Sequence, residues 1–87
     1  MTLYLIDEPL ADIALSYAAE DKDARIVLLQ DGVYLAQKGE VRGEAYVVKD
    51  DVSRRGLGTH TFPPNVHAVG YDELVQMMEN DRVVCFL

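Results

Sequence analysis

The only cysteine of the chain, Cys85, has the side chain best suited to sulfur transfer. A cysteine thiolate takes up sulfur as a persulfide, and reactive thiols occupy exposed, electropositive places, often at the amino ends of helices. Cys85 lies instead within the apolar run Val83–Phe86, where a buried and inert side chain is the common case. We therefore assign Cys85 no catalytic role. A stand-alone sulfurtransferase that uses this thiol is kept as an alternative function.

The segment made of Arg54, Arg55 and Gly56 has the most concentrated positive charge in the chain. It can bind an anion or an acidic surface of a partner, or it can be a solvated helix end beside a glycine cap. Asp31 and Gly32 follow an apolar run and open a predicted helix, where backbone amides can meet an anion. A tight strand-to-helix turn that needs glycine explains this pair more simply. These five residues are the candidates for partner or anion binding.

Acidic side chains recur directly after the predicted strands, at Asp7, Glu8, Asp31, Asp50, Asp51 and Asp72. Ligands of open α/β sheets bind beyond the carboxyl ends of the strands. Carboxylates there could hold Mg²⁺ in a receiver-like phosphate-binding domain, using Asp7, Asp31 and either Asp50 or Asp51. We favour helix capping, because each acid precedes a predicted helix and can accept hydrogen bonds from its free amides.

Metal binding through the two histidines is not expected. His60 and His67 flank a loop that contains Pro63 and Pro64. Zinc prefers more ligands at tighter spacing, and the chain has no second cysteine to complete a site. His67 alternates with apolar neighbours and fits a strand. The sequence therefore predicts neither a metal nor another cofactor.

Short apolar runs alternate with helical segments along the chain. Strands are predicted at residues 2–6, 25–30, 45–48, 66–69 and 82–87, and helices at 9–19, 33–37, 51–55 and 71–79. This order indicates βαβ units with right-handed crossovers. It predicts one domain over residues 1–87, with three α/β/α layers and a mainly parallel five-stranded sheet.

The two longer predicted helices each present an apolar stripe. The residues of these stripes are Leu10, Ile13, Ala14 and Tyr17 in the first helix and Leu74, Met77 and Met78 in the last. Two such helices are too few to cover both faces of five apolar strands. We therefore expect a partner subunit to cover the remaining surface.

The composition supports oligomerisation and argues against several classes of ligand. In 87 residues the hydrophobic fraction is 49% and the formal net charge is −7. A small domain has little interior in which to bury so much apolar material. The negative charge argues against direct nucleic-acid binding and against docking on an anionic membrane. Apolar runs of about five residues are far shorter than the roughly 20 that span a bilayer. With no signal-peptide pattern and no disulfide, we expect a cytoplasmic protein.

Three segments resemble the DsrH/TusB family of sulfur-relay proteins. Residues 26–33 are similar to the family's LLLQDGV segment. Residues 45–57, which contain paired aspartates and then Arg55-Gly56-Leu57, are similar to its VYAL-x-D-D and ARGL stretch. Residues 69–75 resemble its I-x-Y-x-D/E-F-V-x-L ending. The segments occur in family order, at about family spacing, within residues 25–78.

The resemblance implies a small α/β/α domain that assembles with itself or with DsrE/TusD-like and DsrF/TusC-like subunits. Such complexes pass persulfide sulfur toward 2-thiolation of the tRNA wobble uridine, or within sulfur oxidation. The relay cysteine belongs to the DsrE/TusD-like subunit. Some DsrH proteins also carry a cysteine near the end of the first helix, where this chain has Ala18, Ala19, Glu20 and Asp21. The chain therefore resembles the cysteine-free TusB type, and we expect an assembly subunit that is not an enzyme on its own.

Overall fold

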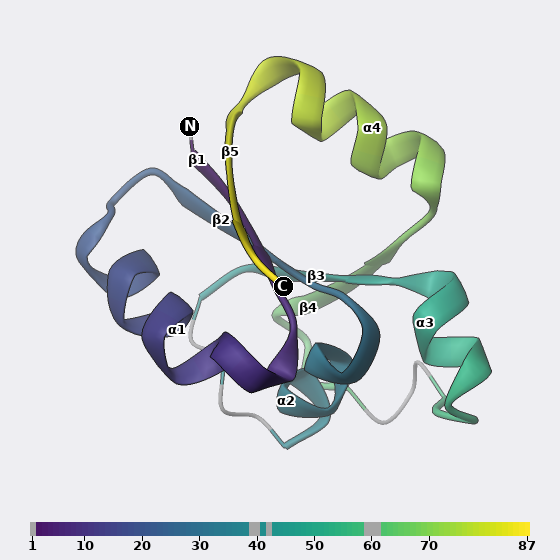
Figure 1. The fold of residues 1–87 in the computed structure, drawn as a ribbon. Coiled ribbons are helices and arrows are strands. Elements are labelled where there is room, and N and C mark those ends of the chain that lie inside the picture. Colours follow the sequence, from purple (N-terminus) through teal and green to yellow (C-terminus); the bar gives the residue numbers. More distant parts are fainter. Residues whose placement is uncertain (1, 39–40, 42, 59–61) are drawn as a thin grey trace.

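Five short apolar runs form one sheet in the computed structural model, which describes residues 2–38, 41, 43–58 and 62–87 (Figure 1). The strands are β1 (Thr2–Ile6), β2 (Ala24–Leu28), β3 (Ala45–Val48), β4 (Val66–Val69) and β5 (Arg82–Phe86). Their order across the sheet is β4-β3-β2-β1-β5, and every neighbouring pair is parallel. The predicted parallel sheet is confirmed, and β4 and β5 form its edges.

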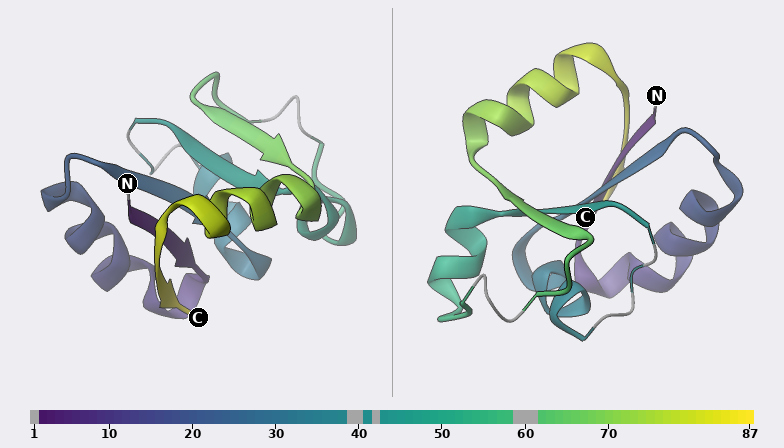
Figure 2. Two further views of the ribbon diagram at one scale, coloured as in Figure 1. Left: turned by 90° about the horizontal axis from the view of Figure 1, so that it is seen from above. Right: turned by 180° about the vertical axis from the view of Figure 1, so that it is seen from behind.

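Helices lie on both faces of the sheet, as the sequence predicts (Figures 1 and 2). They are α1 (Ala11–Glu20), α2 (Val33–Gln37), α3 (Lys49–Arg54) and α4 (Tyr71–Asn80), with single 3₁₀ turns η1 (Glu8–Leu10) and η2 (Gln30–Gly32) before α1 and α2. The result is the expected three-layer α/β/α arrangement. None of the helices in the described ranges is long and apolar enough to cross a bilayer.

The path of the chain across the sheet explains which helix covers which face. From β1 to β4 the chain steps across the sheet in one direction, so right-handed crossovers place α1, α2 and α3 on the same face. The chain then returns from β4 to β5 at the far edge. This last crossover runs the other way, and it places α4 on the opposite face.

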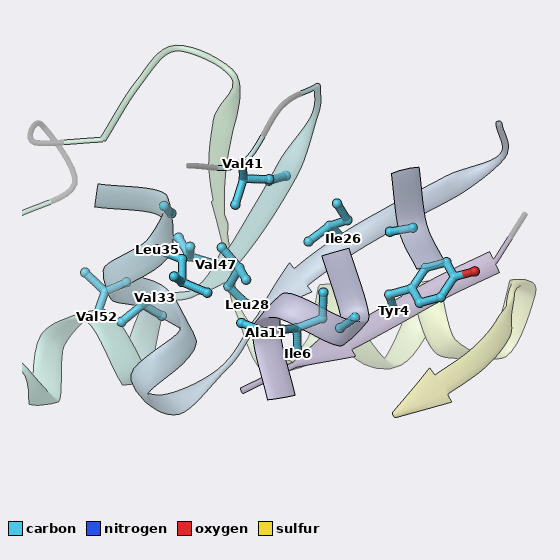
Figure 3. Close-up of a cluster of buried hydrophobic side chains, with 14 residues drawn as sticks. Tyr4, Ile6, Ala11, Ile26, Leu28, Val33, Leu35, Val41, Val47 and Val52 are labelled. Carbon is cyan, nitrogen blue, oxygen red and sulfur yellow. The ribbon is translucent and has the colours of Figure 1, made fainter. Parts of the chain in front are cut away.

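The larger core lies between the sheet and the helices α1, α2 and α3 (Figure 3). Alternate strand residues point into it, and Ile6, Leu28 and Val47 are each fully buried. Val33 of α2 and Val52 of α3 pack against them and are 0% and 2% exposed. Because Val52 belongs to this core, α3 is fixed to the same face as α2.

The opposite face has a smaller core with one covering helix in the described part of the chain. The buried members of this core are Leu3, Leu5, Val27, Val48 and, from α4, Leu74. The apolar surface of α4 also extends beyond its contact with the sheet, because three of its side chains are exposed: Tyr71, Val75 and Met78. We call these three residues the α4 flank. This face fits the expectation that the chain's own helices leave apolar surface uncovered.

The predicted buried stripe of the first helix is partly wrong. Ile13 and Tyr17 are 54% and 57% exposed, and the buried residues of α1 are three alanines, Ala11, Ala14 and Ala18. Small side chains let α1 lie close to the strands, so the larger residues turn outward. The ring of Tyr17 packs instead on Phe86 of β5, with ring centroids 5.9 Å apart.

Cys85 is exposed, which corrects the prediction of a buried thiol. It is in register with Leu5 of β1 and therefore lies on the face that α4 covers. However, β5 is an edge strand, and α4 packs through Leu74 on the more central part of that face. The apolar sequence around Cys85 correctly indicated a strand but did not reveal that this strand is at the edge.

Candidate functional site

The strands β3 and β4 are neighbours, but the helices that follow them lie on opposite faces of the sheet. In open α/β sheets such a reversal opens a crevice beyond the carboxyl ends of the two strands, and ligands bind there. Figure 1 shows α3 and α4 diverging from the ends of β3 and β4. The topology thus identifies the carboxyl ends of β3 and β4 as the place where a binding site is expected.

A groove of about 360 Å³ lies beyond these strand ends, and we call it the switch groove. It is lined by Leu29, Gln30, Asp51, Arg54, Arg55, Tyr71 and Leu74. Its volume is near the lower end of the range for small-ligand sites. The lining residues come from all three segments that carry the family resemblance, residues 26–33, 45–57 and 69–75. Segments that are far apart in the sequence therefore meet at one site.

Asp51 is the buried centre of the switch groove, and only 5% of it is exposed. Its Oδ2 accepts a hydrogen bond of 3.0 Å from the backbone N–H of Gln30. Gln30 has a φ of 50°, a left-handed conformation that costs a non-glycine residue about 1 kcal/mol. The charge-assisted hydrogen bond that Asp51 accepts offsets this cost and fixes the turn after β2 against α3.

Arg55 ties the same two segments together through its guanidinium group. Its Nε donates to Oδ1 of Asp31 at 3.0 Å, and its Nη1 donates to the backbone oxygen of Asp51 at 3.2 Å. The Asp51 carboxylate lies 3.8 Å from Nη1 as well. With its side chain only 20% exposed, Arg55 is held in one orientation. The structure thus brings the predicted candidates Asp31 and Arg55 into direct contact.

Arg54 differs from its neighbour because it remains largely open to solvent. Its side chain is 69% exposed, and its contact with Oδ1 of Asp51 is 3.8 Å, which is longer than a hydrogen bond. Arg54 therefore keeps most of its donor groups available at the rim of the groove. Of the two arginines predicted for partner or anion binding, Arg54 is therefore the one whose charge is accessible.

The two predicted glycines are needed for different reasons. A Cβ on Gly32 would lie 2.6 Å from the carbonyl oxygen of Ile6, so this position requires glycine for close packing. Its N–H already donates to the oxygen of Leu29 at 2.8 Å, which favours the tight turn over an amide site for an anion. Gly56 has a φ of 68° and ends α3, as a glycine cap does.

The carboxylates proposed for a receiver-like magnesium site have separate partners. Asp7 caps η1 by accepting its first amide at 2.7 Å, whereas Asp31 binds Arg55 and Asp51 binds Gln30. Capping is therefore right for Asp7 and wrong for Asp31 and Asp51. In the described ranges, no three His, Cys, Asp or Glu side chains form a group that could hold a metal ion.

Glu8, Asp50 and Asp72 also have no capping bond, because each lies inside the first turn of its helix. There they complement the helix dipole rather than accept from the free amides. Of the two histidines, His60 lies outside the described residues. His67 is in β4 as expected, where it pairs with Glu44 and packs on the ring of Tyr46.

A wider hollow of about 450 Å³ lies near the amino ends of β2 and β3, beside the end of α1. Ala18, Ala19, Asp21 and Glu44 line part of it. The N–H of Asp23, which donates to Asp21 at 3.0 Å, lowers the pKa of that carboxyl below its ordinary value. We favour the switch groove as the binding site, because this hollow lacks cationic donors among its described lining residues.

Two of the predicted candidates, Arg54 and Arg55, line the switch groove, and a third, Asp31, binds Arg55, but the central position of Asp51 was not predicted. One signal was available, since Asp51 and Arg55 are four residues apart and fall on one face of a helix. Tyr71 and Leu74 were not assigned to the site, because nothing local in the sequence places α4 beside α3. Cys85 lies away from the groove, since β1 and β2 separate its strand from β3.

The parallel sheet with one reversal defines a doubly wound, open α/β protein with a polar groove at the switch point. A family model described as "DsrH like protein" matches residues 10–84. The chain therefore belongs to the DsrH-like family, which is a family of sulfur-relay-related proteins. No curated protein matches the sequence.

Two solved structures share the fold over nearly their full length. The crystal structure of the ychN protein from E. coli superposes with a TM-score of 0.74 at 15% sequence identity, covering 98% of this chain and 97% of that one. Protein of unknown function MTH1491 from Methanobacterium thermoautotrophicum superposes with a TM-score of 0.69 at 14% identity, with the same coverage of 98% and 97%. At these identities the similarity concerns the fold alone.

Proposed function

We propose that the chain is a non-catalytic assembly subunit of a sulfur-relay complex that transfers persulfide sulfur. The complex would serve 2-thiolation of the tRNA wobble uridine or a related branch of sulfur metabolism in the cytoplasm. The partners would be DsrE/TusD-like and DsrF/TusC-like subunits, or a second copy of the chain. Membership of the DsrH-like family supports the relay, and the exposed α4 flank supports an assembly role.

The end of α1 carries this proposal, because it lacks the thiol that some DsrH proteins have there. Ala18, Ala19 and Asp21 occupy the position and line the wider hollow. The carboxylates of Asp21 and Glu44 border the same hollow. A thiolate or persulfide is an anion, and carboxylates close to it raise the free energy of its charged form. The surroundings therefore suit a subunit that does not take up sulfur at this point.

Affinity capture from the native host tests the assembly role. The wild-type chain, tagged and expressed at its native level, should recover a DsrE- or DsrF-like subunit, or a second copy of itself, with proteins of tRNA thiolation or sulfur oxidation. Val75→Glu places a charge on the α4 flank and should reduce this recovery. Gln76→Glu adds the same charge beside it without removing an apolar side chain and serves as the matched control. Recovery of none of these proteins by the wild-type chain would contradict the proposal.

The exposure of Cys85 favours one alternative, a stand-alone sulfurtransferase. In that reaction the Cys85 thiolate attacks the outer sulfur of a donor persulfide. A new S–S bond forms on Cys85, the donor S–S bond breaks, and the donor leaves as a thiolate. The purified wild-type chain would then gain one sulfur atom by mass spectrometry, and Cys85→Ser would gain none. A wild-type chain that gains no sulfur from a persulfide donor excludes this alternative.

A further inference from the structure

We propose that the switch groove is a carboxylate-binding site, with Arg54 as its principal donor. The carboxylate would be presented by an acidic side chain of a partner subunit or by a free small carboxylate. The first of these sources rests on the proposed function, and the second does not. Four features of the groove support this inference: donor capacity, preorganisation, charge balance and an apolar lining.

Donor capacity comes from Arg54. Its guanidinium group has five N–H donors, and its contact with Asp51 at 3.8 Å does not use them in a hydrogen bond. Its side chain is 69% exposed, whereas the neighbouring lining residues Asp51 and Leu74 are buried. The planar guanidinium group matches a carboxylate through two parallel hydrogen bonds. A ligand of this kind would therefore find a donor pair without displacing an existing bond.

Preorganisation comes from Arg55 and Asp51, which are fixed by their own contacts. The bonds of Arg55 to Asp31 and to the Asp51 backbone hold its guanidinium plane in place. Asp51 is buried and bonded to Gln30, so the wall beside Arg54 does not need to reorganise on binding. Protein groups that are already fixed lose little conformational entropy when a ligand binds.

The charges of the site select a monoanion over a dianion. Arg54 and Arg55 contribute two positive charges, and Asp31 and Asp51 contribute two negative charges within 4 Å of them. A single negative charge opposite Arg54 adds little repulsion to this balanced set. Phosphate carries more negative charge close to the Asp51 carboxylate, and the whole chain is already at −7. The balance therefore favours a carboxylate over inorganic phosphate.

The groove also has an apolar lining, which determines the kind of group that the carboxylate is attached to. This lining is contributed by Leu29, Tyr71 and Leu74. Leu74 is 6% exposed, whereas Tyr71 is 47% exposed and continues into the α4 flank. An aliphatic stem beside the carboxylate would cover this surface. A glutamate next to an apolar residue has this chemistry, and so does a short-chain fatty acid.

NMR titration of the ¹⁵N-labelled full chain tests the inference. The probes are butyrate, a blocked tripeptide with glutamate next to leucine, and inorganic phosphate at matched ionic strength. We expect saturable shifts at the Arg54 side chain and at the amides of Tyr71 and Leu74 with both carboxylates, and weaker binding of phosphate. Tighter binding of the tripeptide would identify a protein source, and tighter binding of butyrate a free carboxylate. Phosphate binding as tight as the carboxylates, or no saturable shift with either carboxylate, would overturn the assignment.

Variants separate this site from general surface charge. Arg54→Gln should weaken butyrate binding about tenfold, as expected for the loss of one charge-assisted contact. Arg54→Lys keeps the charge but loses the planar pair of donors. Its affinity for butyrate should therefore lie between those of the wild type and Arg54→Gln. Arg82→Gln removes an exposed arginine from β5 and should leave binding unchanged. Equal losses in Arg54→Gln and Arg82→Gln would show that only net charge matters and would overturn the inference.

This inference and the proposed function can fail separately. If the chain captures relay partners but its groove binds neither carboxylate, the assembly role stands and the carboxylate site is wrong. If the groove binds carboxylates but the chain captures no relay partner, the site stands and the assembly role is wrong.

Discussion

Replacement of Asp51 by alanine should destabilise the fold strongly, because this side chain joins two segments at the switch groove. Asp51 is 5% exposed, and its Oδ2 accepts the N–H of Gln30 at 3.0 Å. Alanine would leave that N–H without its acceptor, while Gln30 would still have a φ of 50°. It would also remove the anion that faces Arg55 at 3.8 Å.

The expected loss follows from these contacts. A hydrogen bond to a charged group contributes about 1.5–3 kcal/mol. Both arginines lie 3.8 Å from the carboxylate; the pair with Arg54 is exposed and adds almost nothing, and the less exposed pair with Arg55 adds a few tenths of a kcal/mol. The expected loss in the free energy of unfolding of Asp51→Ala is therefore about 2–3 kcal/mol in total. In a domain of this size, about 1 kcal/mol shifts the melting temperature by roughly 4–8 °C, so Tm should fall by roughly 10–20 °C.

Urea unfolding followed by circular dichroism measures this loss. Asp50→Ala is the matched control, because Asp50 is exposed on the same helix, and it should change stability by less than about 0.5 kcal/mol. Asp51→Asn keeps the shape of the side chain and one acceptor oxygen. Its free energy of unfolding should therefore lie between those of Asp51→Ala and the wild type. An Asp51→Ala variant that is as stable as Asp50→Ala would refute the reasoning about the buried carboxylate.

Three further predictions concern other parts of the fold. Gly32→Ala should cost about 1–3 kcal/mol in the same unfolding assay, because its Cβ would lie 2.6 Å from the Ile6 oxygen, and an unchanged midpoint would contradict this. Cys85 should react with iodoacetamide in the native state nearly as fast as in urea, because it is exposed, whereas native protection would contradict an open edge strand. The N–H of Asp23 lowers the pKa of Asp21 below 3.8, so the stability from Asp21 is present above pH 3.8 and is lost as the pH falls through the lower folded value. Asp21→Asn should therefore flatten the acid side of the pH–stability curve, and a curve identical to the wild type would argue against this assignment.

Much of the fold could be predicted from the sequence, because local patterns determine the elements. The apolar runs predicted all five strands, and their alternation with helical segments predicted parallel pairing. The outward face of α1 could not be predicted, since Ile13 and Tyr17 have larger apolar surfaces than the alanines that are buried. Burial there depends on how closely the helix approaches the sheet. The exposure of Cys85 depends on strand order, which no local pattern encodes.

The switch groove was only partly predictable for the same reason. Arg54 and Arg55 were recognisable in the sequence as a concentration of positive charge, and Asp31 was recognisable as an acid that follows a strand. Their convergence with Tyr71 depends on β3 and β4 being adjacent while their helices lie on opposite faces. This is a property of the whole sheet. The left-handed conformation of Gln30 was also hidden, because glycine or asparagine is the usual signal for it.

Sulfur transfer through the captured complex tests the central claim most directly. The complex recovered from the native host would receive a ³⁵S-labelled persulfide donor. The measurement is the amount of ³⁵S that the complex transfers to the sulfur acceptor. The comparison is between complexes assembled with the wild-type chain, with the Cys85→Ser chain and without the chain. We predict equal transfer with wild-type and Cys85→Ser chains and reduced transfer without the chain. Loss of transfer in the Cys85→Ser complex, with assembly intact, would contradict a non-catalytic role.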